Sequence, residues 1–110
     1  MPDEPRFDDL IHAPQRLRIC AIASAATHVE FGELQRRLEI SKSALSKQLS
    51  QLVDAGYLSE ERITRGGRPR VRLSMTDVGR HAYLTHLAAL REIINAPEAG
   101  MQPAAQTSTG

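Results

Sequence analysis

Residues 31–58 read FGELQRRLEISKSALSKQLSQLVDAGYL, and this stretch decides the fold. Its apolar residues recur three and four positions apart in two runs, 31–38 and 44–53, which predicts two helices. Ser41 is a good N-cap for the second helix, and Gly56 is the expected point at which that helix ends. Two short helices joined by a tight turn are the arrangement of a helix-turn-helix.

The chain beyond this stretch predicts a β-hairpin followed by one long helix. Residues 57–63 and 70–75 are expected to be its strands, because apolar and polar residues alternate clearly in the second segment. Gly66-Gly67 marks the turn between them, and Thr76 is the expected cap of a helix over 77–94. The apolar surface of this helix is broader than one small domain covers, which favours a partner.

The chain before this stretch predicts a further helix, from Pro14 to Ala26, after a short apolar cluster. The order helix, short helix, turn, helix, hairpin, long helix predicts a mainly α fold with a small β-hairpin (α+β). It is the order of a winged helix-turn-helix with a long C-terminal dimerisation helix. We expect one domain over residues 1–95 and a disordered tail over 96–110, where Pro, Ala, Gln, Ser, Thr and Gly dominate.

Positive charge is concentrated in the middle of the chain. The net charge is only +1, but residues 42–72 hold seven basic and three acidic residues, while both flanks are acidic in balance. The second helix should expose lysines and serines opposite its leucines, and the hairpin carries five arginines with no acidic residue between them. Such uncompensated guanidinium groups favour an anionic partner. The candidate DNA-binding residues are Lys42, Ser43, Ser46, Lys47, Ser50, Arg62, Arg65, Arg68, Arg70 and Arg72.

The quoted stretch, together with RGGRPRVRLSMTDVGR at residues 65–80, resembles the MarR/ArsR-like winged-helix transcriptional regulators, closest to their small single-domain members. Those families typically show the pattern S..LS..L..L..AGY, an arginine-rich wing and an LT..G entry to the final helix. Met75 stands where that entry usually has leucine, and the vicinal cysteines of the metal-sensing members are absent from the sequence. The resemblance implies DNA contacts from Ser43, Ser46, Lys47, Arg65, Arg68 and Arg70.

The resemblance also implies dimerisation through the first and last helices, in agreement with the surplus apolar surface. The candidate interface residues are Phe7, Leu10, Ile11, Tyr83, Leu84, Leu87, Leu90 and Ile94. The expected partners are therefore a second copy of the chain and double-stranded DNA with an inverted repeat. The sequence identifies no small-molecule effector.

Other classes of function find little support in the sequence. There is no nucleophile with a matched base and no phosphate-binding loop, so we expect no enzyme activity and no cofactor. Four histidines, His12, His28, His81 and His86, lack the spacing of metal ligands and are interpreted as isolated surface or interface residues, with no metal site. The single cysteine, Cys20, lies in an apolar segment and is interpreted as a buried small hydrophobe.

No apolar run is long enough to cross a bilayer and the N-terminus is acidic, so a cytoplasmic protein without membrane contact is expected. Two alternatives to a sequence-specific regulator stay open at this point. A winged-helix interaction module would use the basic face to bind an acidic protein or RNA. A nonspecific nucleoid-associated protein would bind DNA without preferring a palindromic site.

Overall fold

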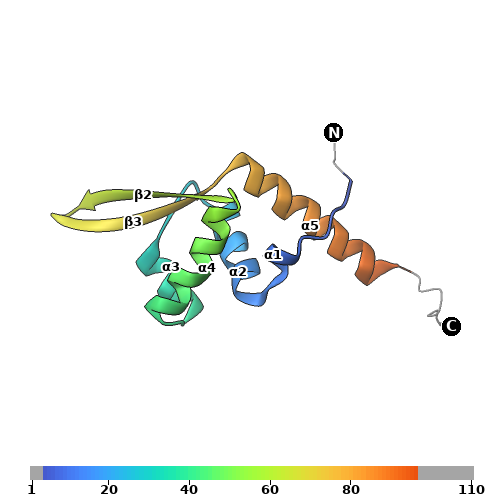
Figure 1. The fold of residues 1–110 in the computed structure, drawn as a ribbon, viewed down its shortest axis with the longest axis horizontal. Helices are drawn as coiled ribbons and strands as arrows, with labels where there is room; N and C mark the ends of the chain where they lie inside the picture. The colour runs from blue at the N-terminus through green and yellow to red at the C-terminus, as the bar shows by residue number, and fades with distance from the viewer. Residues whose placement is uncertain (1–3, 97–110) are drawn as a thin grey trace.

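The structure is a computed structural model, and it describes residues 4–96. It is mostly helical, with one three-stranded antiparallel sheet of strand order β1-β3-β2 (Figure 1). The elements in chain order are α1 (Asp9–His12), α2 (Pro14–Ser24), β1 (Val29–Glu30), α3 (Phe31–Leu38), α4 (Lys42–Asp54), β2 (Leu58–Arg65), β3 (Arg68–Met75) and α5 (Asp77–Asn95). The predicted fold class is confirmed.

Helices α3 and α4 form the predicted helix-turn-helix. The hydroxyl of Ser41 accepts a hydrogen bond from the main-chain N–H of Ala44 at 3.1 Å, so the predicted N-cap is in place. Glu39 ends α3 in the left-handed region, with φ 56° and ψ 48°. Sequence periodicity therefore placed both helices, but it gave no sign that a glutamate would adopt this backbone conformation.

Strands β2 and β3 form a hairpin that extends away from the helices, on the opposite side of the molecule from the end of α5 (Figure 1). Its two-residue turn is Gly66-Gly67, with φ values of 62° and 76°. Positive φ at both turn residues matches the right-handed twist of the flanking strands and favours glycine. The hairpin was predicted, whereas β1 was not, because a two-residue strand carries no periodicity. We refer to β2, the turn and β3 as the wing.

The start of α5 is fastened to the end of the helix-turn-helix. The hydroxyl of Thr76 accepts from the N–H of Gly79 at 2.9 Å and donates to the carbonyl of Gly56 at 2.6 Å. The N–H of Thr76 also donates to the carbonyl of Tyr57 at 3.0 Å. Gly79 packs so tightly on the main chain of Tyr57 that a Cβ there would overlap it. These four residues are called the Thr76 clasp below.

The hydrophobic core lies between α2, α3, α4 and the sheet. Its fully buried side chains include Ile11, Ile19, Cys20, Leu34, Leu45, Leu52, Leu58 and Leu73. Burial is the main cause that raises the pKa of the Cys20 thiol to about 12, so the thiol stays protonated and unreactive. The interpretation of Cys20 as a buried small hydrophobe is confirmed.

The N-terminal part differs in detail from the prediction. The helix expected over 14–26 ends at Ser24, and the apolar cluster before it contains a one-turn helix, α1. The expected disordered tail lies outside the described residues from 97 onward, so its disorder stays a prediction. None of the helices within residues 4–96 has the length and apolar character needed to cross a membrane.

Candidate nucleic-acid interface

Helix α4 presents one polar face to solvent. Its core-facing residues Leu45, Leu49 and Leu52 are buried, as the sequence predicted. The five polar residues that were predicted to lie opposite are all exposed: Lys42, Ser43, Ser46, Lys47 and Ser50. Short serines between lysines let a helix approach a nucleic acid closely while the ammonium groups reach phosphates or base edges.

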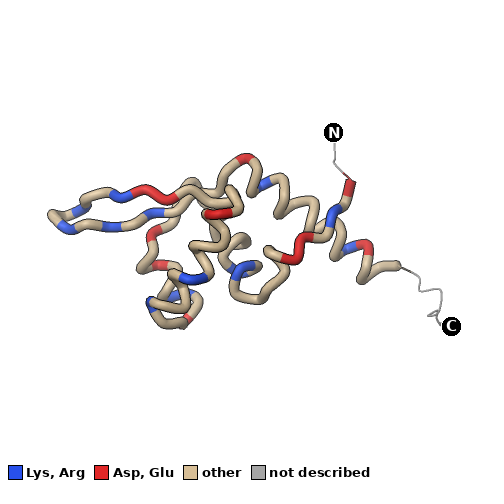
Figure 2. Tube along the Cα trace, in the orientation of Figure 1, with Lys and Arg blue, Asp and Glu red and all other residues tan. Residues whose placement is uncertain are grey.

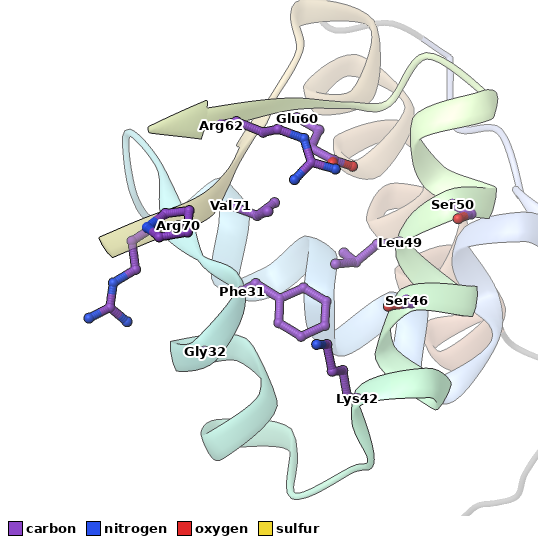
Figure 3. Close-up of a pocket in the computed structure, with 11 residues that line it drawn as sticks. Phe31, Gly32, Lys42, Ser46, Leu49, Ser50, Glu60, Arg62, Arg70 and Val71 are labelled. Carbon is purple, nitrogen blue, oxygen red and sulfur yellow. The ribbon is translucent and has the colours of Figure 1, made fainter. Parts of the chain in front are cut away.

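A groove separates α4 from the wing, and Figure 3 shows side chains of both elements around it. Phe31, Leu49 and Val71 point into its centre and form an apolar floor. Lys42, at the start of α4, and Arg62, on β2, reach toward the same space from its two sides (Figure 3). The structure thus brings three of the predicted helix residues, Lys42, Ser46 and Ser50, and two predicted wing residues, Arg62 and Arg70, to a single concave surface.

The strand register divides the wing arginines between two faces. Arg62 lies opposite Val71 across the hairpin and shares the face that lines the groove. Side chains alternate along a strand, so Arg65, Arg68, Arg70 and Arg72 stand on the other face. Figure 2 shows basic residues along both strands out to the tip of the wing. Arg70 also lines the groove, but Figure 3 shows its guanidinium directed away from the centre.

The prediction of five uncompensated arginines is wrong for Arg65 and Arg72. Arg65 binds the carboxylate of Glu30 through two hydrogen bonds of 2.8 Å, and Arg72 binds Glu61 at 2.9 and 3.0 Å. The bond from Arg65 lowers the pKa of Glu30, and the bond from Glu30 raises the pKa of Arg65, so both stay charged. Glu61 lies directly across the hairpin from Arg72.

The other three wing arginines have no carboxylate partner within the part of the chain that the structure describes. Arg62, Arg68 and Arg70 are exposed and form no salt bridge with any residue of the described range 4–96. The unpaired positive charge is therefore on Arg62 at the groove and on Arg68 and Arg70, whereas Glu30 neutralises Arg65, next to the turn, and Glu61 neutralises Arg72.

The candidate interface residues fall into two groups. Phe7, Leu84 and Ile94 are 41%, 54% and 76% exposed, and Leu10, Leu87 and Leu90 are partly buried. Ile11 is fully buried and Tyr83 is 8% exposed, so these two pack within one copy of the chain and support the surface from beneath.

The interpretation of the histidines as isolated surface or interface residues is wrong for His12 and His86. His86 is completely buried, and its ring nitrogen lies 3.3 Å from a ring nitrogen of His12. The two residues are 74 positions apart, so no spacing rule could have paired them. Across residues 4–96 there is no group of three His, Cys, Asp or Glu side chains able to hold a metal ion.

Comparison with known proteins agrees with this geometry. Residues 15–94 match the family described as winged helix DNA-binding domain, which is a binding family and not an enzyme family. No curated protein sequence matches the chain.

Among solved structures, a transcriptional regulator homologue from Pyrococcus horikoshii OT3 is 22% identical with a TM-score of 0.74, covering 78% of this chain and 85% of its own. A MarR-family protein from Porphyromonas gingivalis W83 is 20% identical with a TM-score of 0.62, covering 79% and 84%. HlyU from Vibrio cholerae N16961 is 22% identical with a TM-score of 0.58, covering 78% and 84%. These structures share the fold, and the sequence match decides the family: the chain belongs to the winged helix DNA-binding domain family.

Proposed function

We propose that the protein is a sequence-specific transcriptional regulator that binds double-stranded DNA as a homodimer. The observation that carries the proposal is the groove between α4 and the wing, where the exposed Lys42 and Arg62 face the same space. Helix α4 is the recognition helix and enters the major groove, because its polar face is exposed from Lys42 and Ser43 at its start to Ser50.

The wing contacts the DNA beside the recognition helix. Its tip carries Arg68 and Arg70 without salt bridges among the described residues, and arginine binds phosphates or a narrow minor groove well. Arg65 and Arg72 have a different task. Their carboxylate partners tie β2 to β1 and to β3, so these two arginines brace the wing and contribute less to DNA affinity.

Dimerisation uses the exposed apolar residues of α5 and the N-terminus. Leu84 and Ile94 expose more than half of their surface, and Phe7 nearly as much, which is costly for a chain that stays monomeric. A two-fold axis along this surface would present two recognition helices to an inverted repeat. The half-sites of such a repeat lie about one helical turn, or about 34 Å, apart.

The test is selection of bound sequences from a pool of random duplex DNA, followed by affinity measurements on the recovered sites at two salt concentrations. An inverted repeat with half-sites about one turn apart is the expected result. Two other results would contradict it. Binding without any sequence motif, with affinity that collapses as salt rises, would indicate a nonspecific nucleoid-associated protein. Binding of acidic protein or RNA in preference to duplex DNA would indicate an interaction module.

A further inference from the structure

The N-terminal residues 6–12, called the strap below, are fastened to α5 by a cluster of rings. The N–H of Asp8 donates to Nδ1 of His86 at 2.9 Å, and the N–H of Arg6 donates to the carbonyl of Thr85 at 3.1 Å. Nε2 of His86 lies 3.3 Å from Nδ1 of His12. The ring of Phe7 covers both histidines, with ring centres 4.8 Å apart in each case.

The hydrogen bonds fix the protonation of this pair. Nδ1 of His86 accepts from a main-chain N–H, so it carries no proton, and the proton of the neutral ring is on Nε2. Nε2 therefore donates to Nδ1 of His12, which must itself be unprotonated. A proton added to His86 would face the N–H of Asp8, and one added to Nδ1 of His12 would face the proton on His86. The contacts are complete only when both rings are neutral.

The same tautomer argues against a metal ion between the two rings. A ligating nitrogen must be unprotonated, and Nε2 of His86 carries the proton of the neutral ring. The pair thus has the chemistry of a proton-sensitive contact and not that of a metal site.

A chain of hydrogen bonds runs from the strap to the recognition helix. Nε of Arg16, on α2, donates to the carbonyl of Leu10 in the strap at 2.6 Å. Nη1 of the same guanidinium donates to the side-chain carbonyl of Gln48 on α4, also at 2.6 Å. Arg16 is half-buried between these partners, so its position depends on where the strap places Leu10.

The strap also reaches Tyr57, three residues beyond the end of α4. The carboxylate of Asp8 accepts from the hydroxyl of Tyr57 at 2.6 Å, and its other oxygen accepts from the N–H of Ile11 at 3.1 Å. One segment of seven residues therefore contacts α5, braces α4 through Arg16, and holds the turn after α4.

We infer that the strap is a proton-sensitive clamp: protonation of the His12–His86 pair releases residues 6–12 from α5, and through Arg16 and Gln48 this loosens the recognition helix and weakens DNA binding. The DNA-binding part of the inference rests on the proposed function. The part that concerns the strap and Gln48 does not.

The charged groups around the pair set the direction of its pH dependence. Burial, and then the neighbouring His12, lower the pKa of His86, while the carboxylates of Asp8 and Asp9 oppose this shift. The pKa values of Tyr57 and Cys20, from the elements packed against the strap, are raised to about 12, so both stay neutral below pH 8. Two further groups face the strap: the guanidinium of Arg16 on α2, which donates to the carbonyl of Leu10, and His81 of α5, which lines the same hollow as Asp8 and Asp9.

The lowered pKa of His86 determines whether a fall in pH strengthens or weakens the clamp. The unfolded chain binds a proton at this ring near pH 6.5, whereas the folded chain binds it only at lower pH. The clamp is therefore at full strength above about pH 6.5 and weakens as the pH falls below that value.

The first experiment follows the strap directly by NMR on the full chain. At pH 7.5 the nitrogen shifts of His86 should report a neutral ring protonated at Nε2, and the amide of Asp8 should be protected from exchange. As the pH falls to about 5, we expect that protection and the side-chain amide signal of Gln48 to change together with protonation of the pair. An Nδ1-protonated His86 would overturn the inference, as would a Gln48 signal that does not move when the rings titrate.

The second experiment measures the affinity for the selected duplex at pH 7.5 and 5.5 at constant ionic strength. The dissociation constant should rise by about fivefold or more at pH 5.5, in the range of ordinary coupling between sites. Added positive charge would by itself tighten DNA binding, so a loss of affinity has the opposite sign to a general electrostatic effect.

Three variants sharpen this second experiment. His12→Gln/His86→Gln should remove the pH response, because glutamine offers the same neutral donor and acceptor groups without titrating. His12→Gln alone should reduce the response. Because His12 is exposed, this single variant should fold even if the double variant folds poorly. His28→Gln is the control at an exposed histidine outside the strap and α5, and it should keep the full response. A response lost with His28→Gln, or unchanged in the double variant, would overturn the clamp.

Failure of the clamp and failure of the proposed function give different results. A protein that binds no duplex at any pH would contradict the proposed function, while the NMR titration of His86 and Gln48 would still decide the clamp. DNA binding that is independent of pH, together with release of the strap, would contradict the coupling through Arg16.

Discussion

Lys47 and Arg68 carry the same charge but lie on different elements, Lys47 on α4 and Arg68 at the tip of the wing. Lys47→Ala should reduce discrimination between the selected site and its single-base variants, because a helix in the major groove reads base edges. Arg68→Ala should weaken binding to all sequences and flatten the dependence of log affinity on log salt by about one unit. Equal and sequence-independent losses from both variants would contradict these roles.

Because Gly79 has no Cβ, the start of α5 lies directly against the main chain of Tyr57. Gly79→Ala would push a methyl group into the main chain of Tyr57, and we expect a loss of about 2–3 kcal/mol in the free energy of unfolding, since overpacking that moves the backbone is costly. Gly32→Ala is the matched control, because Gly32 is also helical but has open space where the Cβ would lie. That variant should be neutral or slightly more stable. Urea unfolding of both variants measures the difference.

The turn between α3 and α4 contains a glutamate in a backbone conformation that favours glycine. Glu39 has a positive φ, a conformation that costs a non-glycine residue about 1–2 kcal/mol, although glycine gives part of this back in the unfolded chain. Glu39→Gly should therefore stabilise the fold by about 0.5–1 kcal/mol. Glu39→Ala should give no such gain, since alanine keeps the Cβ. Thermal unfolding distinguishes them, and equal melting temperatures would contradict the argument.

Periodicity and capping located most elements to within a few residues, because they depend on neighbours in sequence. Ser41 and Thr76 both cap the helices they were predicted to cap. Contacts between segments that are far apart in the sequence could not be predicted from such patterns. Arg65 and Glu30 are 35 positions apart, and neither residue carries a local sign of the other. The sequence therefore indicated which residues are basic and exposed, whereas only the structure showed which of them are already paired.

At the scale of the whole molecule, the exposed apolar residues of α5 make the oligomeric state testable. Leu84→Glu should shift the protein from dimer to monomer in analytical ultracentrifugation, because a carboxylate would be buried in the proposed interface. Val78→Glu is the control: Val78 is 61% exposed on the same helix but was not assigned to the interface. Far-ultraviolet circular dichroism should show that both variants are folded. A dimer that survives Leu84→Glu would remove this residue from the interface.

The Thr76 clasp joins the main chain at 56–57 to the start of α5, and the whole wing lies between these two points. The clasp closes the base of the hairpin, and among the ion pairs within residues 4–96 only that of Arg65 with Glu30 ties the tip to another part of the fold. Changes in loop length cost little when the ends of a loop are already held together. The wing is thus a natural site for insertions. Its length and its sequence could be changed, in evolution or by design, without changes to the helices that carry it.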